Sequence, residues 1–234
     1  QTQNIFSLTS MSSSRFMKWL VTFLALFGPR TPVRATHNIR ATGLNIRNYG
    51  PIGKEIGGGF HGSVFRLNNH PNLVVKIMPI TWNARKEYNI QKQLGNIGVA
   101  PRVHSFHNIN VNGRRYPAIV MNRLGANGDS YMILANYMNK YGLSKTNFNI
   151  IKNTYNIMHG AGVGHGNIHE YNIAVILNKN GKVKGVKFID FGLSRRTGNK
   201  HSKITFNQNR EGLANLEALI GKPPGRRISY ALGP

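Results

Sequence analysis

The chain has 234 residues, of which 40% are hydrophobic. This is enough for one domain of ordinary size with a buried core, and it excludes a wholly disordered chain. The chain contains no cysteine, which excludes a disulfide scaffold and a thiolate zinc site. Its 31 Lys and Arg residues and 7 Asp and Glu residues give a formal net charge of +24.

The positive charge comes mainly from missing acids. The sequence holds 2 Asp and 29 Asn, and several of these Asn residues lie where turn chemistry would accept Asp equally well. We therefore interpret the charge as a general loss of carboxylates, with a dedicated nucleic-acid-binding surface as the alternative. Either origin predicts non-specific, salt-sensitive binding to polyanions.

Residues 1–48 differ from the rest of the chain and are predicted to form an N-terminal extension. Met17 to Ala35 resemble a secretory leader, with a basic start, an apolar run and an exit of small residues. The apolar run, residues 19–27, is too short to span a bilayer as a helix, so no transmembrane span is predicted. The alternatives are a short buried or amphipathic helix and a poorly ordered leader. Secretion or delivery to a host therefore stays open beside a cytoplasmic location.

Strand-like segments dominate the sequence between residues 49 and 124, where apolar residues occur in short runs bounded by turn residues. A helix is predicted over residues 82–94, and Asn112-Gly113 predicts a hairpin turn. The predicted strands are residues 52–57, 63–67, 73–78, 102–110 and 116–122.

Helices dominate the sequence from residue 125 onward. Two short strands flank Asn180-Gly181, and the second strand ends over residues 186–189. A strand-rich first half followed by a helical second half predicts an α+β fold in two lobes. The predicted lobes are residues 49–124 and 125–234. The predicted helices of the second lobe are residues 129–141, 145–161 and 208–220.

A glycine-rich loop is predicted between two strands of the first lobe. Residues 57–64 read Gly-Gly-Gly-Phe-His-Gly-Ser-Val, a G-x-G-x-x-G-x-V pattern whose glycines let backbone N–H groups approach phosphates. A dinucleotide-binding turn is the alternative, but it needs a helix after the glycines. Residues 63–67 continue as a strand instead, which favours a β-hairpin loop that closes over phosphates.

Lys76 and Glu87 form a candidate ion pair in the first lobe. Lys76 lies in the apolar segment of residues 73–77, where an ammonium group is costly to bury without an anionic partner. The alternative is an edge lysine whose ammonium group reaches water. Glu87, on the predicted helix, is the only carboxylate between Gly57 and Gly128. A phosphate group and Glu87 would both satisfy Lys76.

Two further motifs follow in the second lobe. Residues 165–173 read His-Gly-Asn-Ile-His-Glu-Tyr-Asn-Ile, and residues 188–193 read Phe-Ile-Asp-Phe-Gly-Leu. The glycine-rich loop, the strand lysine, an H-x-[D]-x-x-x-x-N motif and a D-F-G motif thus occur in the order typical of protein kinases. The chain therefore resembles the protein-kinase-like superfamily over about residues 52–221, which is most of its length.

The resemblance implies a site for ATP and Mg²⁺. Lys76 would hold the α- and β-phosphates and pair with Glu87, while Asn172 and Asp190 would hold Mg²⁺. Asn167 occupies the position of the catalytic aspartate. Backbone groups of residues 122–124 would hydrogen-bond adenine. The other nucleotide-binding positions would be loop, gatekeeper and hinge residues: Gly57, Gly59, Gly62, Val64, Met121 and Leu124.

Asn167 is the main departure from the family pattern. An Asn amide cannot accept a proton near neutral pH, although it can orient a substrate hydroxyl group. Loss of a general base costs roughly 10²–10⁴-fold in rate, whereas phosphoryl transfer depends mostly on positioning and electrostatics. Two functions therefore stay open. One is a protein kinase that transfers the γ-phosphate to Ser or Thr hydroxyl groups and is impaired by Asn167; the other is a catalytically dead, nucleotide-binding pseudokinase that acts as an interaction module.

The second departure is length, because only 42 residues follow Gly192 in the sequence. The abbreviated second lobe resembles compact kinases, such as RIO-type kinases and small kinases secreted by bacterial pathogens or encoded by viruses. The implied partner is a protein substrate, and a host protein if the chain is a secreted effector. Small-molecule kinases of aminoglycoside or choline type share the catalytic motif, but they usually depart from D-F-G and have a larger second lobe.

Overall fold

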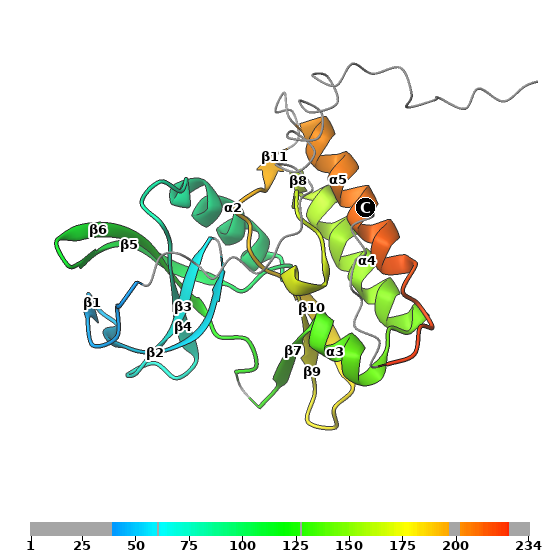
Figure 1. Cartoon of the computed structure of the whole chain (residues 1–234), viewed down its shortest axis with the longest axis horizontal. Coiled ribbons are helices and arrows are strands. Elements are labelled where there is room, and N and C mark those ends of the chain that lie inside the picture. Colours follow the sequence, from blue (N-terminus) through cyan, green and yellow to red (C-terminus); the bar gives the residue numbers. More distant parts are fainter. Residues whose placement is uncertain (1–38, 60, 127, 197–201, 225–234) are drawn as a thin grey trace, which may run out of the picture. The chain divides into compact units, whose positions relative to one another are not determined.

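The computed structural model describes residues 39–59, 61–126, 128–196 and 202–224. Within these ranges the chain is a mixed α/β protein, with a strand-rich N-terminal part followed by most of the helices (Figure 1). The described residues belong to one structural unit, Ala35–Arg227. The leader-like segment predicted for residues 17–35 lies outside the described residues.

A six-stranded antiparallel sheet forms the strand-rich part. In order across the sheet, its strands are β1 (Asn45–Ile46), β2 (Gly50–Gly59), β3 (Gly62–Leu67), β4 (Leu73–Ile77), β6 (Arg114–Asn122) and β5 (Val103–Val111). The helix α2 (Ala84–Asn96) packs against β5 and β6. Asn112 and Gly113 both have positive φ, of 50° and 80°, as a tight hairpin between β5 and β6 requires. The predicted hairpin turn is therefore confirmed.

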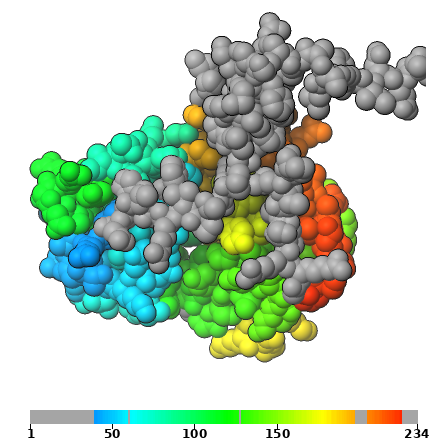
Figure 2. Space-filling view, viewed as in Figure 1, coloured from blue at the N-terminus to red at the C-terminus, as the bar shows by residue number. Residues whose placement is uncertain are grey.

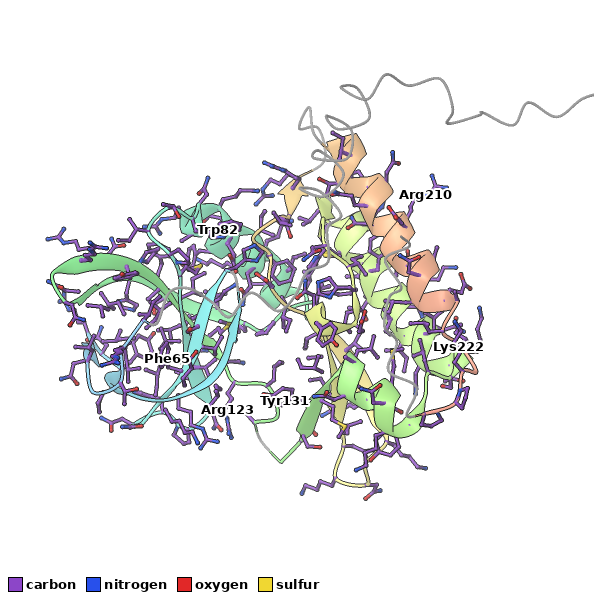
Figure 3. The ribbon with its side chains drawn as sticks, in the orientation of Figure 1. Phe65, Trp82, Arg123, Tyr131, Arg210 and Lys222 are labelled. Atoms are coloured by element: carbon purple, nitrogen blue, oxygen red, sulfur yellow. The ribbon has the colours of Figure 1, made fainter. Side chains whose placement is uncertain are left out.

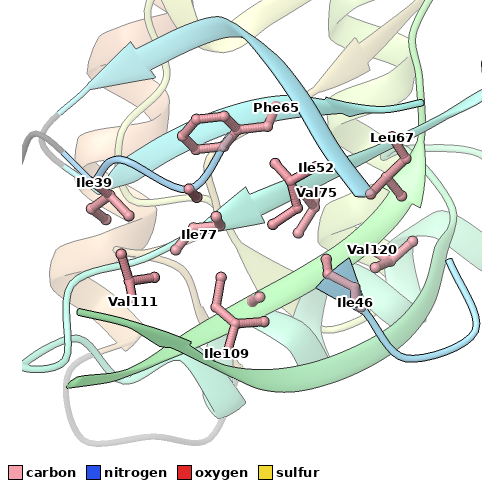
Figure 4. Close-up of a cluster of buried hydrophobic side chains, with 12 residues drawn as sticks. Ile39, Ile46, Ile52, Phe65, Leu67, Val75, Ile77, Ile109, Val111 and Val120 are labelled. Carbon is pink, nitrogen blue, oxygen red and sulfur yellow. The ribbon is translucent and has the colours of Figure 1, made fainter. Parts of the chain in front are cut away.

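The alternation of residues along β3 and β4 separates a core face from a face that borders a cavity. Phe65, Leu67, Val75 and Ile77 are at most 2% exposed and pack in one hydrophobic cluster (Figure 4). Because successive side chains of a strand point to opposite faces, their neighbours lie on the other side of the sheet. The register of the two strands pairs Val64 with Lys76 on that other face.

The sheet begins earlier in the chain than expected. β1 pairs with β2, and Ile39, Ala41 and Ile46 are buried in the same cluster as the strands that follow. Residues 39–48, which the sequence analysis assigns to the N-terminal extension, therefore contribute to the sheet. Their few apolar residues are spaced among polar ones, so only the pairing with β2 reveals which of them are buried.

The second half of the described chain contains a smaller sheet and three helices. The small sheet is antiparallel, and a short 3₁₀ helix precedes its central strand. In chain order the elements are β7 (Ser130–Ile133), α3 (Leu134–Tyr141), α4 (Lys145–Gly160), β8 (Val163–Gly164), η2 (Glu170–Asn172), β9 (Ile173–Leu177), β10 (Val183–Phe188), β11 (Arg195–Arg196) and α5 (Ser202–Glu217). Strands β7, β9 and β10 form the small sheet, and β8 pairs with β11.

The helix predicted for residues 129–141 is wrong in its first part. Its first residues form β7, which pairs with β9 and brings Tyr131 opposite Ile176. Helix α3 begins only after Ile133, whose backbone is extended. A short strand of this kind is stabilised by its partner rather than by its own pattern, which is why the local sequence favours a longer helix.

The last helix also differs from the prediction of residues 208–220. It begins at Ser202 and ends at Glu217. The sequence pattern missed its first turns because they are polar and carry no clear apolar period. Beyond its end, Ile220 forms a bridge with Leu143. No helix in the described part of the chain is both long and apolar enough to cross a membrane.

The helix predicted for residues 145–161 and the hairpin at Asn180-Gly181 are confirmed. In the hairpin turn, Asn178 Oδ1 accepts the backbone N–H groups of Asn180 and Lys182 at 2.9 and 3.0 Å. Gly181 has a φ of 72°, which favours glycine. The turn projects at the lower edge of the face shown in Figure 2, in yellow.

Candidate functional site

A cavity of about 470 Å³ lies between the six-stranded sheet and the β9–β10 hairpin. Of the predicted site residues, two are not among the residues that line it: Glu87, which lies behind Lys76, and Asn167. The structure therefore brings most of the predicted nucleotide and metal site together in one place. The predicted residues that line the cavity are Gly57, Gly59, Gly62, Val64, Lys76, Met121, Leu124, Asn172 and Asp190.

The glycine-rich loop is a β-hairpin, as the sequence predicts. Strands β2 and β3 remain paired as far as Gly59 and Gly62. Gly62 has a φ of 128°, and a β-carbon there would overlap the carbonyl oxygen of Ile77 on β4. Glycine is therefore required for the close approach of this loop to β4.

Lys76 on β4 joins two carboxylates. Its Nζ atom lies 2.6 Å from Glu87 Oε1 and 3.0 Å from Asp190 Oδ1. The side chains of Lys76 and Glu87 are only 9% and 1% exposed. Burial by itself lowers the pKa of Lys76, but the charges of Asp190 and Glu87 outweigh it and raise that pKa above its usual range. Lys76 is therefore a charged ammonium group held at the cavity, and the predicted ion pair with Glu87 is present.

Glu87 has a second donor in Trp82. Trp82 Nε1 donates to Glu87 Oε2 at 3.0 Å, so each carboxylate oxygen has a partner. Asn83 caps α2 by accepting the backbone N–H of Lys86 at 3.2 Å, which fixes the helical turn that carries Glu87. The indole of Trp82, labelled beside α2 in Figure 3, also packs on Gly192, where a β-carbon would overlap the ring.

Asp190 contacts both Lys76 and the glycine-rich loop. Its φ is 64°, which is uncommon for a residue other than glycine. Oδ1 accepts the Lys76 ammonium, and Oδ2 lies 2.7 Å from His61 Nδ1 in the glycine-rich loop. Burial by itself raises the pKa of Asp190, but Lys76 and His61 outweigh it and hold that pKa well below its usual range. Asp190 is therefore ionised throughout the physiological pH range.

The β9–β10 hairpin brings Asn172 next to Asp190. Phe188 pairs with Ile173, and the N–H of Ile189 donates to the carbonyl oxygen of Asn172 at 3.0 Å. This register places the residue before β9 beside the residues that follow β10. Two side chains that carry oxygen atoms, Asn172 and Asp190, consequently line the same cavity.

Asn172 is also linked to the loop that precedes it. Its Nδ2 atom donates to the carbonyl oxygen of Asn167 at 3.0 Å and lies 3.0 Å from His169 Nε2. Both contacts use the amide nitrogen, and a metal ion would use the amide oxygen instead. Asn167 itself is half-buried, so its backbone supports a candidate metal ligand while its side chain lies outside the cavity lining.

His165 has a structural role. It is fully buried, and its Nε2 atom lies 3.0 Å from the carbonyl oxygen of Ile189, the residue before Asp190. Burial lowers the pKa of His165 to about 4, although the hydrogen bond to Ile189 acts in the opposite direction. At neutral pH this histidine is therefore uncharged, and it positions Asp190 through the bond to Ile189 rather than acting in proton transfer.

The predicted hinge is the segment that leaves β6. The N–H of Asn122 donates to the carbonyl oxygen of Arg102, and that of Arg123 donates to Asn72, both at 2.8 Å. Of the three N–H groups in residues 122–124, the segment whose backbone groups the resemblance assigns to adenine, two are therefore already used within the fold. In the described part of the chain, the N–H of Leu124 is the one of the three without a backbone partner. Figure 3 labels Arg123 at this connection.

Two residues of the site, His61 and Trp82, have no role in any sequence motif. Trp82 comes just before α2, and only the folded structure brings it against Glu87 and Gly192. His61 could have been singled out because it lies inside the glycine-rich loop, where its side chain can face whatever the loop covers. The contact between His61 and Asp190 could not have been predicted, since the two residues are far apart in the chain.

Comparisons with known proteins give little further information. No protein-family model and no curated protein matches the chain. A similar solved structure is that of the PK-1 kinase of Cydia pomonella granulovirus, which is 21% identical with a TM-score of 0.46. The similarity covers 63% of this chain and 52% of that one, so the chain spans about half the length of the kinase.

Proposed function

We propose that the chain binds ATP with Mg²⁺ in this cavity and transfers the γ-phosphate to a Ser or Thr hydroxyl group of a protein. The observation that carries the proposal is the position of Lys76, whose buried ammonium group contacts Glu87 and Asp190 beside a glycine-rich hairpin. In protein kinases these residue types hold the phosphates and the metal. The proposal includes a two-lobed arrangement, with the predicted lobes at residues 49–124 and 125–234 and with residues 39–48 added to the first lobe, whose sheet they join.

Phosphate binding is supported by the charge and the backbone of the site. Lys76 supplies a positive charge that is shielded from water. A β-carbon built on Gly57 or Gly59 would meet no atom within 4 Å, so there is room for a ligand next to this backbone. Backbone N–H groups that a ligand can approach closely are well suited to phosphate oxygens.

Asp190 and Asn172 suit Mg²⁺, which prefers oxygen ligands. Both side chains line the cavity, and Asp190 is ionised. Mg²⁺ would bind a carboxylate oxygen of Asp190 and the amide oxygen of Asn172. When bound, the ion would neutralise the negative charge of the phosphates.

An apolar part of the cavity supports binding of the adenine base. It is lined by Val64, Val74, Met121, Leu124 and Ile133. Leu124, whose N–H has no backbone partner among the described residues, supplies a donor at this end, so one polar contact and several apolar ones would orient a flat base. A volume of about 470 Å³ is in the range of pockets that hold small ligands.

Asn167 favours a slow reaction and carries the second candidate function. The residue cannot remove a proton from the substrate hydroxyl group, so the rate should fall by roughly 10²–10⁴-fold relative to a kinase with aspartate there. The other parts of the site do not depend on it, because its side chain is outside the cavity lining. A nucleotide-binding pseudokinase that acts as an interaction module is therefore the alternative.

Transfer of labelled γ-phosphate distinguishes these functions. The chain, Asn167→Asp and an Asp190→Ala blank would be incubated with Mg²⁺, γ-labelled ATP and a generic protein mixture. Transfer by the chain above the blank supports a slow kinase, and transfer by Asn167→Asp alone supports the pseudokinase. If neither variant transfers phosphate and ATP does not raise the melting temperature of the chain, the proposal of nucleotide binding is wrong.

A further inference from the structure

We propose that His61 competes with a divalent metal ion for Asp190 and holds the glycine-rich loop over the cavity until the metal displaces it. The inference rests on the proposed function, because it requires Asp190 to bind the metal ion of a nucleotide. It adds a role for His61, a residue at a variable position of the glycine-rich motif.

Both oxygens of Asp190 already have side-chain partners. Lys76 Nζ lies 3.0 Å from Oδ1, and His61 Nδ1 lies 2.7 Å from Oδ2. Lys76 is fixed by burial on β4 and by a second bond to Glu87. Each carboxylate oxygen has two lone pairs, so a metal ion replaces a partner only where it takes that partner's lone pair, and His61 is the partner on a hairpin loop. The exchange therefore takes place at Oδ2.

The imidazole of His61 has a defined position. It stacks on the indole of Trp82 with ring centroids 4.2 Å apart and an interplanar angle of 29°. Trp82 is anchored in turn by its bond to Glu87. The His61 side chain is 12% exposed and lines the cavity. A polar contact to Asp190 and an aromatic contact to Trp82 therefore both help to position His61 in the loop.

His61 and the metal ion would compete for the same lone pair of Asp190 Oδ2. With His61 bound, the glycine-rich loop is held against the carboxylate, and with a metal ion bound, this contact is lost. Binding of a metal–nucleotide complex must therefore be weakened by the strength of the His61 contact. The net contribution of a typical protein hydrogen bond is enough to change an affinity about threefold to tenfold.

Isothermal titration calorimetry with a non-hydrolysable ATP analogue tests the exchange. Each protein would be titrated in excess Mg²⁺ and again in EDTA. His61→Ala removes the contacts with Asp190 and with Trp82. His61→Phe keeps a ring that can stack on Trp82 but has no nitrogen for Asp190. His70→Ala is the matched control, because His70 stacks edge-on against Tyr49 and does not line the cavity.

In Mg²⁺, both His61 variants should bind the analogue about threefold to tenfold more tightly than the parent chain. In EDTA, their affinity should equal that of the parent, and His70→Ala should match the parent under both conditions. The phenylalanine variant, which keeps the stacking, guards against a result caused by disorder of the loop.

Three results would overturn the inference, and each has a different meaning for the site. Equal or weaker binding by the His61 variants in Mg²⁺ means that His61 does not compete with the metal. An equal gain in Mg²⁺ and in EDTA means that His61 obstructs the nucleotide itself. Absence of binding by every protein refutes the proposed nucleotide site, and the inference with it, whereas the first two results leave that site intact.

Discussion

Replacing Lys76 with Met should destabilise the folded chain by about 3–5 kcal/mol, because it leaves a buried ion pair with one partner. Met fills similar space without the charge. Glu87 is 1% exposed, so its carboxylate cannot regain a partner from water. Trp82 still donates to Glu87, and His61 still contacts Asp190. These remaining contacts place the expected loss at the lower end of the range.

A double-mutant cycle isolates the pair from other effects of the substitution. Glu87→Gln alone leaves Lys76 with Asp190 as its partner and should cost less than Lys76→Met. The double variant removes both charges, so its loss should be smaller than the sum of the single losses by about 1–3 kcal/mol.

Urea unfolding followed by circular dichroism measures these free energies. Lys54→Met, a substitution at an exposed lysine on β2, is the matched control and should stay within about 0.5 kcal/mol of the parent chain. The reasoning is wrong if Lys76→Met costs no more than this control. It is also wrong if the losses of the two single variants simply add in the double variant.

Three further predictions concern the core, the glycine-rich loop and His165. Phe65→Ala should cost about 3–5 kcal/mol in urea unfolding, because the side chain is 1% exposed in the sheet core; a loss below 1 kcal/mol would contradict that burial. Gly62→Ala should lower the melting temperature and weaken binding of the ATP analogue, because a β-carbon there would overlap the carbonyl oxygen of Ile77 at a φ of 128°; an unchanged variant would show that the loop does not approach β4. The pKa of His165 falls from 6.5 to about 4 on folding, so its stabilising effect is present above pH 6.5 and is lost toward pH 4. At about 1.4 kcal/mol per pKa unit, urea unfolding across this range should show the parent losing about 3 kcal/mol more than His165→Gln, and parallel curves would refute the assignment.

The strands of the large sheet were predictable because their local pattern and their tertiary role agree. Apolar residues alternate in β3 and β4, and the same alternation places Lys76 on the cavity face. The strand β7 was not predictable in this way. Its four residues continue into α3 without a break in hydrophobicity, and only the pairing with β9 makes them a strand.

The residue types of the site were predictable, but their contacts were not. Motif order identifies Lys76, Asn172 and Asp190, since the chemistry of each type is specific. The hydrogen bond between His61 and Asp190 joins segments that are far apart in the chain, and no spacing rule predicts it. The resemblance assigns backbone groups of residues 122–124 to adenine, but it could not show that the fold already uses the N–H of Asn122.

Calorimetric titration of the unmodified chain with ATP, with and without Mg²⁺, would show whether the cavity binds a nucleotide. Inorganic tripolyphosphate is the control, because it carries the phosphate charge without the base and would bind equally well to a merely basic surface. We expect ATP to bind one-to-one and saturably, more tightly than tripolyphosphate and more tightly still with Mg²⁺. In Asp190→Asn this dependence on Mg²⁺ should be lost. Equal binding of ATP and tripolyphosphate, steeply weakened by salt and unchanged in Asp190→Asn, would contradict a nucleotide site in the cavity.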